Sequence, residues 1–280
     1  MNFDNIPRLP LGEWIESGLD FLTDHGADFT LALSRLMRSN IGHLNDALLW
    51  VPPWAVIIVV ALGCWRFSGF RLGLFALLGL GLIWNIELWV PMMESLSLVV
   101  IATLISVIIA LPVGMLAALF KGVNRVVMPV LDFMQTMPAF VYLIPAIPFF
   151  GIGEMSAIFA TIIFSMPPAI RFTILGIQQV PEDLVEGADA FGSTRGQKLF
   201  KLQLPLAWPT IMAGINQTIM LALSMVVIAA MVGANGLGKE VYGAIQRLEP
   251  GAGFEAGIAV VILAILLDRI TQSFKGHQRQ

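Results

Sequence analysis

Long apolar stretches, separated by short polar turns, alternate along most of the chain. Seven of them reach or approach the roughly 20 residues that an α-helix needs to cross a bilayer. Together they cover residues 49–65, 71–90, 95–120, 126–150, 155–176, 206–232 and 255–271. Pro52 and Pro53 shorten the first stretch, so six spans is the alternative count. The pattern predicts an all-α polytopic membrane protein with about seven transmembrane helices over 49–272, followed by a short polar tail at 273–280.

Residues 1–48 form a region of a different kind, because apolar residues there recur at helical spacing instead of forming a continuous run. The recurring positions are Leu11, Trp14, Ile15, Leu19, Leu22, Phe29, Leu33, Leu36, Met37, Ile41, Leu44 and Leu48. Acidic residues fill the opposite face of the first half, and Arg35 and Arg38 appear in the second. Such a pattern predicts one or two amphipathic helices, interrupted near Gly26, that lie on the membrane surface. A small helical hairpin packed on the outer face of the spans is the alternative.

Composition and basic residues add the compartment and the orientation. The chain is 57% hydrophobic and only 12% charged, far from an average soluble domain, and we expect no nucleic-acid partner. Lysine and arginine gather in segments 66–71, 121–125, 195–201 and 269–279, whereas the turns at 91–94 and 151–154 contain none. Because basic loops stay in the cytoplasm, we expect the N-terminus outside and the C-terminus inside.

A charged loop over residues 181–205 separates the fifth and sixth apolar stretches. Its end, residues 186–205, reads EGADAFGSTRGQKLFKLQLP. Four small residues would let a short helix seat closely against another protein, and charged residues would supply polar contacts around that seat. The small residues are Gly187, Ala188, Ala190 and Gly192, and the charged ones are Glu186, Asp189, Arg195, Lys198 and Lys201. An ordinary polar loop of a polytopic protein is the plainer interpretation.

The loop resembles the EAA loop of ABC-importer permeases. It has an E-x-A triplet, a glycine four residues after the last alanine of the triplet, and a Leu-x-Leu-Pro close. The middle residue of the triplet is Gly187 where the family pattern has alanine, which exchanges one small residue for another. The resemblance implies a coupling helix at about 184–196 that sits in a groove of a cytoplasmic ATPase. The contact residues it implies are Glu186, Gly187, Ala188, Asp189, Ala190, Gly192 and Arg195.

No constellation for catalysis or metal binding appears in the sequence. Gly233-Ala-Asn-Gly-Leu-Gly-Lys239 satisfies most of a phosphate-binding loop, but Glu240 follows where a Ser or Thr must hold Mg²⁺. The segment before it is an apolar helix and not a strand, so a flexible glycine-rich turn is the better interpretation. The three histidines are scattered, without partners at metal-ligand spacing. We therefore expect no enzyme, no catalytic residue, no metal and no cofactor on this chain; the resemblance implies that ATP and Mg²⁺ bind to a partner ATPase.

Polar residues and prolines inside the apolar stretches suggest a path for a solute. Polar groups inside a membrane are costly unless they are paired or face water. The candidate lining residues are Gln135, Thr136, Pro138, Tyr142, Pro167, Asn216, Gln217 and Ser224. Prolines cluster in the fourth and fifth stretches, where they predict broken or kinked helices and a movable core. The alternatives are that Asp132 and Arg171 snorkel or pair near the cytoplasmic ends, and that the amides join neighbouring helices.

Three further passages are similar to the glycine betaine/proline branch of the same permeases. They cover residues 134–153, 165–218 and 231–248. The similarity implies a homodimer in the lipid of the bacterial inner membrane, two ATPase subunits and an extracytoplasmic binding protein. It implies glycine betaine as cargo, with proline betaine, choline, carnitine or proline as further candidates, and an osmoprotective role. An importer for another amino acid such as methionine, a self-sufficient secondary carrier and a membrane enzyme remain alternatives.

Overall fold

The computed structural model describes residues 10–276 and contains helices but no strand within that range. The ends of the predicted tails, 1–9 and 277–280, lie outside the described residues. The helices are α1 Leu11–Trp50, α2 Pro53–Ser68, α3 Phe70–Asn85, α4 Trp89–Leu119, α5 Lys121–Thr136, α6 Leu143–Phe150, α7 Glu154–Gln178, α8 Glu182–Ala190, α9 Arg195–Lys198, α10 Leu204–Ala230, α11 Leu237–Arg247 and α12 Pro250–Gly276. A 3₁₀ turn, η1 (Ala139–Tyr142), precedes α6, and a π turn, η2 (Leu199–Gln203), precedes α10. The all-α prediction is confirmed.

The predicted apolar stretches correspond to helices of unequal length. In the described chain, four helical segments are long and apolar enough to cross a membrane alone: α4, α7, α12 and the segment that runs from α9 into α10. Counting bent helix pairs as single spans raises the number to six, and the shorter apolar helix α3 is separate. Each of the seven predicted stretches is thus helical, with α2 and α3 only 16 residues long.

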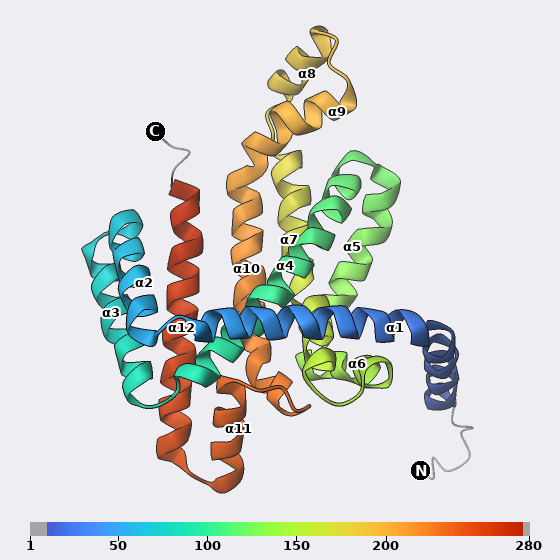
Figure 1. Ribbon diagram of the computed structural model, residues 1–280. Coiled ribbons are helices and arrows are strands. Elements are labelled where there is room, and N and C mark those ends of the chain that lie inside the picture. Colours follow the sequence, from blue (N-terminus) through green and yellow to red (C-terminus); the bar gives the residue numbers. More distant parts are fainter. Residues whose placement is uncertain (1–9, 277–280) are drawn as a thin grey trace, which may run out of the picture.

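The centre of the bundle is the trio α4, α7 and α10, with α7 between the other two (Figure 1). Glycines let these helices approach closely. A Cβ on Gly114 of α4 would lie 2.6 Å from the Cβ of Thr173, and one on Gly214 of α10 would lie 2.6 Å from the Cβ of Phe172. Ser106 donates to the carbonyl of Ile162 at 3.1 Å, which adds a polar tie between α4 and α7. Close packing on both sides makes α7 the most enclosed of the candidate spans.

Prolines act differently in the fourth and fifth apolar stretches. The fourth is broken at Met137-Pro138, where α5 and the η1–α6 segment meet at 112°. The fifth is not broken, because α7 continues through Pro167 and Pro168 to Gln178. Both prolines are buried between α4 and α10, whose side-by-side packing supports the helix where a backbone donor is missing. The predicted break is therefore confirmed for the fourth stretch, whereas the fifth is unbroken and only the alternative of a kinked packing helix remains for it.

Helix α1 lies crosswise to the bundle and is partly covered by it (Figure 1). Its second half packs against α4 and α6, where Met37 and Ile41 are buried. In its first half the apolar side chains of Trp14, Ile15 and Phe21 are exposed. The second half of α1 therefore packs against the bundle. For the first half, contact with the lipid surface stays a prediction.

The glycine-rich segment after α10 is a tightly packed turn, so the expectation of a flexible one is wrong. Gly236 has φ +110°, and a Cβ there would lie 2.4 Å from the Ser95 Oγ. The same hydroxyl accepts a hydrogen bond from the Leu237 N–H at 2.8 Å. Gly238 sits on the backbone of α10, where a Cβ would lie 2.1 Å from the carbonyl oxygen of Val226. The turn thereby fixes the start of α11 against α4 and α10.

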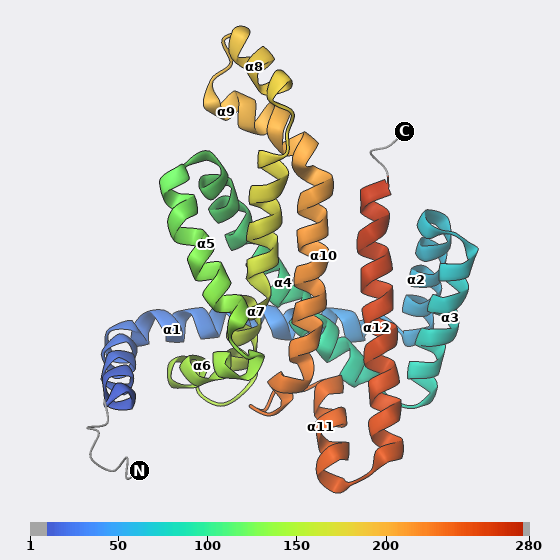
Figure 2. The same cartoon turned by 180° about the vertical axis from the view of Figure 1, so that it is seen from behind.

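Polar loops are sorted between the two ends of the bundle as the alternation of spans requires. Helices α8 and α9, the α2–α3 turn, the α4–α5 corner and the end of α12 lie at one end, and α6 and α11 lie toward the other (Figures 1 and 2). Within the described residues, the basic segments that the sequence assigns to the inside share the first end, which is called the α8 end below. Which end faces the cytoplasm stays a prediction from the charge distribution.

Candidate functional site

The loop with the E-x-A triplet projects from the α8 end as a short helical hairpin, α8 followed by α9 (Figure 1). None of the residues of α8 is buried, which is unusual for a helix of a packed protein. Gly187 and Ala188 are half-buried, while Glu186, Ala190 and Arg195 are exposed. Phe191, at the tip, is 93% exposed. Exposed aromatic side chains of this kind are common among the residues that anchor protein–protein interfaces.

The geometry of the tip explains Gly192. The Ser193 N–H donates to the Ala188 carbonyl at 3.0 Å, and the Gly192 N–H donates to the Asp189 carbonyl at 2.9 Å. These two bonds form a Schellman motif that ends α8, with Gly192 at φ +76° in the left-handed position. Gly192 is thus required by the backbone, and not only by its small size. A bulky substitution there would strain the turn as well as block docking, so Phe191 is the cleaner position for testing contact.

Hydrogen bonds hold the hairpin in one shape. Thr194 caps α9: its Oγ1 accepts from the Gln197 N–H at 3.3 Å, and its own N–H donates to Gln197 Oε1 at 2.9 Å. Lys198 Nζ pairs with Asp189 Oδ2 at 2.7 Å and joins α9 to α8. Asp189 therefore has an internal partner. From α9 the chain continues through η2 into α10 without an extended linker, so the hairpin is joined stiffly to the central trio.

Two of the predicted path residues meet in a groove on one side of the central trio. Gln135 of α5 and Gln217 of α10 line it together with Arg171 of α7. The rest of the wall is mainly apolar and includes Phe164 and Phe172. The groove has a volume of about 500 Å³, within the usual range of small-molecule sites. Arg171 also forms an ion pair with Asp132 at the edge, so the alternative that these two charges pair holds in the structure.

The other predicted path residues on α5, η1 and α7 shape the walls near the groove. Thr136 is exposed and donates to the carbonyl of Phe133 at 2.9 Å, and Pro138 forms the corner after it. The Tyr142 hydroxyl donates to the carbonyl of Met134, a groove residue, from a buried ring. Pro167 is buried inside α7 and does not line the groove.

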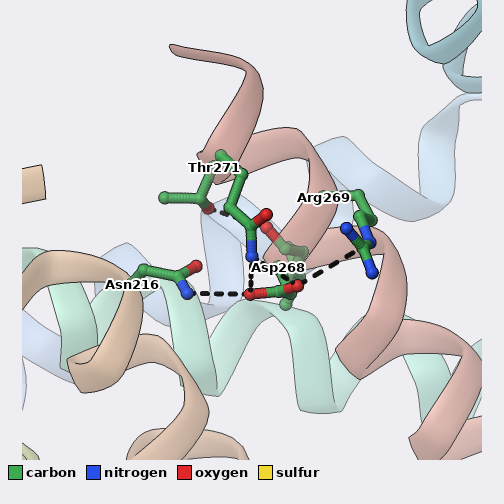
Figure 3. Close-up of polar contacts among 6 residues, drawn as sticks. Asn216, Asp268, Arg269 and Thr271 are labelled. Carbon is green, nitrogen blue, oxygen red and sulfur yellow. Dashed lines mark hydrogen bonds and ion pairs between the residues drawn. The ribbon is translucent and has the colours of Figure 1, made fainter. Parts of the chain in front are cut away.

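On α10 the structure separates the three predicted polar residues. Ser224 lies seven residues after Gln217, hence on the same exposed helix face, and donates to its own helix at the Met220 carbonyl. Asn216 points the other way, toward α12, where its Nδ2 donates to Asp268 Oδ1 at 2.8 Å (Figure 3). Asn216 therefore joins helices, which is the alternative given above, and does not line the groove.

Asp268 is a residue of this region that the sequence did not single out. Besides Asn216, it accepts from Gln272 Nε2 at 2.7 Å, and Arg269 lies at 3.9 Å (Figure 3). Its position near the end of the last apolar stretch is typical of a solvated carboxylate, and only the partner across the helices shows otherwise. Asp268 belongs to no metal-type cluster, since no three His, Cys, Asp or Glu side chains come together within residues 10–276.

Removing the Asp268 carboxylate should loosen α12 from α10. In Asp268→Ala the Asn216 Nδ2 group loses the carboxylate oxygen that accepts its hydrogen bond. The Oδ1 atom of Asn216 is already buried without a partner. We expect a loss of about 1–3 kcal/mol of unfolding free energy, as for other unpaired buried polar groups. Asp268→Asn keeps an acceptor at the same place and should lose less than half as much. Thermal unfolding of the purified protein in detergent measures both; equal stability of all three proteins would contradict the assignment.

The sequence of this chain is similar to those of known transport proteins. The family model described as binding-protein-dependent transport system inner membrane component matches residues 110–279. A glycine betaine transport system permease protein of Bacillus subtilis is 50% identical over 272 residues, which is 97% of this chain and 96% of the relative. A glycine betaine/carnitine transport permease protein of Listeria monocytogenes is 51% identical and covers 96% of this chain and 97% of its own.

A solved structure supports the fold. A chain of the MetNI methionine ABC transporter in inward-facing conformations matches with a TM-score of 0.63 at 22% identity, over 67% of this chain and 94% of that one. At this identity the likeness concerns the fold alone. It agrees with the helical permease architecture that the EAA-type loop implies.

Proposed function

The chain belongs to the family of binding-protein-dependent transport system inner membrane components, and on this basis we propose that it carries glycine betaine across the membrane as the permease of an ATP-driven importer. Proline betaine, carnitine, choline and proline are the further cargo that we propose, and protection against osmotic stress is the proposed role. Relatives named for glycine betaine or carnitine transport, at 50% and 51% identity over nearly the whole chain, support the cargo class.

The proposed assembly is a homodimer of this chain with two cytoplasmic ATPase subunits and an extracytoplasmic binding protein. The α8 end, which carries the basic segments, then faces the cytoplasm, so the C-terminus is inside and the N-terminus outside. The ATPase subunits hold ATP and Mg²⁺, and this chain supplies the route and a two-state element. The binding protein delivers the solute at the end formed by α6 and α11.

One observation carries the proposed coupling: the hairpin α8–α9 has no buried residue in α8, yet it continues directly into the helix that lines the groove. Docking of an ATPase on Glu186, Gly187, Ala188 and Phe191 would thus reach α10 through η2, and α7 through the Gly214–Phe172 contact. When ATP closes the ATPase pair, the two hairpins of the dimer approach each other and the spans open outward; hydrolysis resets them. ATP shifts this equilibrium only because it favours one of the two states.

Reconstitution tests the proposed function. The chain, with its ATPase and binding protein, should take up radiolabelled glycine betaine into proteoliposomes only when ATP and the binding protein are both present. Unlabelled proline betaine should compete and methionine should not. Uptake by this chain alone would contradict the importer, and ATP-dependent uptake of methionine would contradict the cargo.

A further inference from the structure

The groove between α5, α7 and α10 has features that fit one kind of solute. We propose that it holds a zwitterion during passage, with the quaternary ammonium group against Phe164 and Phe172 and the carboxylate on Arg171. This inference rests on the proposed function and adds to it the residues that touch the cargo. The predicted path included neither Phe164 nor Phe172, and the sequence left open whether Arg171 lines the path or only pairs with Asp132.

The charges of the groove are arranged as a fixed pair. Arg171 and Asp132 bind each other across α7 and α5, so the site has no net charge to attract simple ions. The Arg171 Nε–H is buried and has no hydrogen-bond partner within the described chain. The Arg171 side chain nevertheless lines the groove and is 31% exposed, so N–H groups of the guanidinium beyond the one that binds Asp132 face a carboxylate there. A charge-assisted bond of this kind is stronger than a neutral one. A neutral pair whose cation keeps further donors suits a molecule that carries both charges.

The aromatic side chains supply the other half of the site. Phe164 and Phe172 lie eight residues, just over two helical turns, apart on α7, and both are half-buried in the groove wall. The Phe164 ring is braced edge-on by Tyr142, with the ring centroids 5.7 Å apart. Aromatic faces attract quaternary ammonium groups, and the attraction grows where water is excluded. Neither the aromatic rings nor the quaternary ammonium group needs a hydrogen bond. The ammonium end of the solute can therefore leave the rings without breaking one.

Amides complete the lining without fixing the solute. Gln135 and Gln217 are exposed on facing helices, and each offers a donor and an acceptor to passing polar groups. Two of the three walls are connected to the proposed coupling hairpin: α10 continues from α8–α9, and α7 packs on α10. A movement of the hairpin would therefore change the width of the groove. A translocation site needs such a change in width, and a purely structural ion pair does not.

Exchanging the two charges distinguishes a translocation site from a purely structural ion pair. The double variant Asp132→Arg/Arg171→Asp restores an ion pair but moves the cation from α7 to α5. In the reconstituted complex we expect normal assembly and normal stimulation of the ATPase by loaded binding protein. We expect glycine betaine uptake to fall about tenfold or more, since a charged hydrogen bond is lost. Uptake at the wild-type rate in the double variant would overturn the proposal.

A second pair of variants covers the case in which the exchange does not assemble. Phe172→Leu keeps the Cβ that packs on Gly214 but removes the ring, and uptake should fall about three- to tenfold; Phe172→Tyr should restore most of it. Wild-type uptake in Phe172→Leu, or equal loss in both variants, would overturn the aromatic half of the site. Absence of ATP-dependent uptake by the wild-type complex would instead contradict the proposed function, so the two failures are distinguishable.

Discussion

Replacing Gly238 by alanine should prevent the α10–α11 turn from closing and should leave little folded protein. The new Cβ would lie 2.1 Å from the carbonyl oxygen of Val226 and 2.6 Å from its carbonyl carbon. Both atoms belong to the backbone of α10, which cannot rotate out of the way as a side chain can. We expect a loss of about 3 kcal/mol or more, at the upper end of what overpacking costs. The yield of monodisperse protein in detergent and its thermal unfolding midpoint measure the effect.

Gly243 provides the matched control on the same helix. A Cβ there would meet only the guanidinium of Arg247, with 3.4 Å to its nearest nitrogen, and that group is the mobile end of an exposed side chain. Gly243→Ala should therefore be neutral or slightly stabilising, because alanine favours the helix more than glycine does. Comparable loss in both variants would show that α11 tolerates no substitution and that the close approach at Gly238 is not the cause.

The contrast between these two glycines shows why part of the fold could not be predicted. Hydrophobic length alone is sufficient to predict the seven helical stretches, since the bilayer imposes it on each segment separately. The same local pattern cannot say that Gly236 and Gly238 touch Ser95 and Val226, because those contacts depend on how distant helices meet. A glycine-rich segment therefore predicts a flexible turn until the packing around it is known.

The prolines also show that local sequence and tertiary packing act together. Pro138 follows a residue that must leave the helical region, and the chain bends there as predicted. Pro167 and Pro168 occupy a similar local context, yet α7 continues because α4 and α10 support it from both sides. Local chemistry sets the cost of a break, and tertiary packing decides whether the break occurs.

For the candidate sites, the motif was more informative than the polarity of single residues. The E-x-A spacing locates a projecting hairpin, although only the geometry shows that Gly192 is a left-handed cap and that Asp189 is tied to Lys198. For the path, Asn216 and Gln217 are adjacent in sequence but lie on different faces of α10, one toward Asp268 and the other toward the groove. Neighbouring positions of a helix point about 100° apart, and polarity alone does not say which of them faces a cavity.

Replacing Phe191 by serine should strongly weaken binding of the ATPase without unfolding the permease. The ring is 93% exposed and makes no contact on which the hairpin depends, while the Schellman motif and the Thr194 cap remain intact. If the ring enters a groove of the ATPase, its loss removes a buried aromatic anchor, which costs about 2 kcal/mol or more in other interfaces. We expect affinity for the ATPase to fall about 30-fold or more, with uptake lost in proportion.

Phe254→Ser is the matched control, because it removes an exposed aromatic ring away from the hairpin. Phe254 is 74% exposed at the start of α12, at the opposite end of the bundle from α8. The same chemical change there should leave ATPase binding at the wild-type level, because only the α8 end presents the hairpin. Co-purification of the ATPase with each variant, followed by uptake, separates the cases. If Phe191→Ser retains the ATPase as Phe254→Ser does, the contact lies elsewhere on the α8 end and the coupling proposed for the hairpin is wrong.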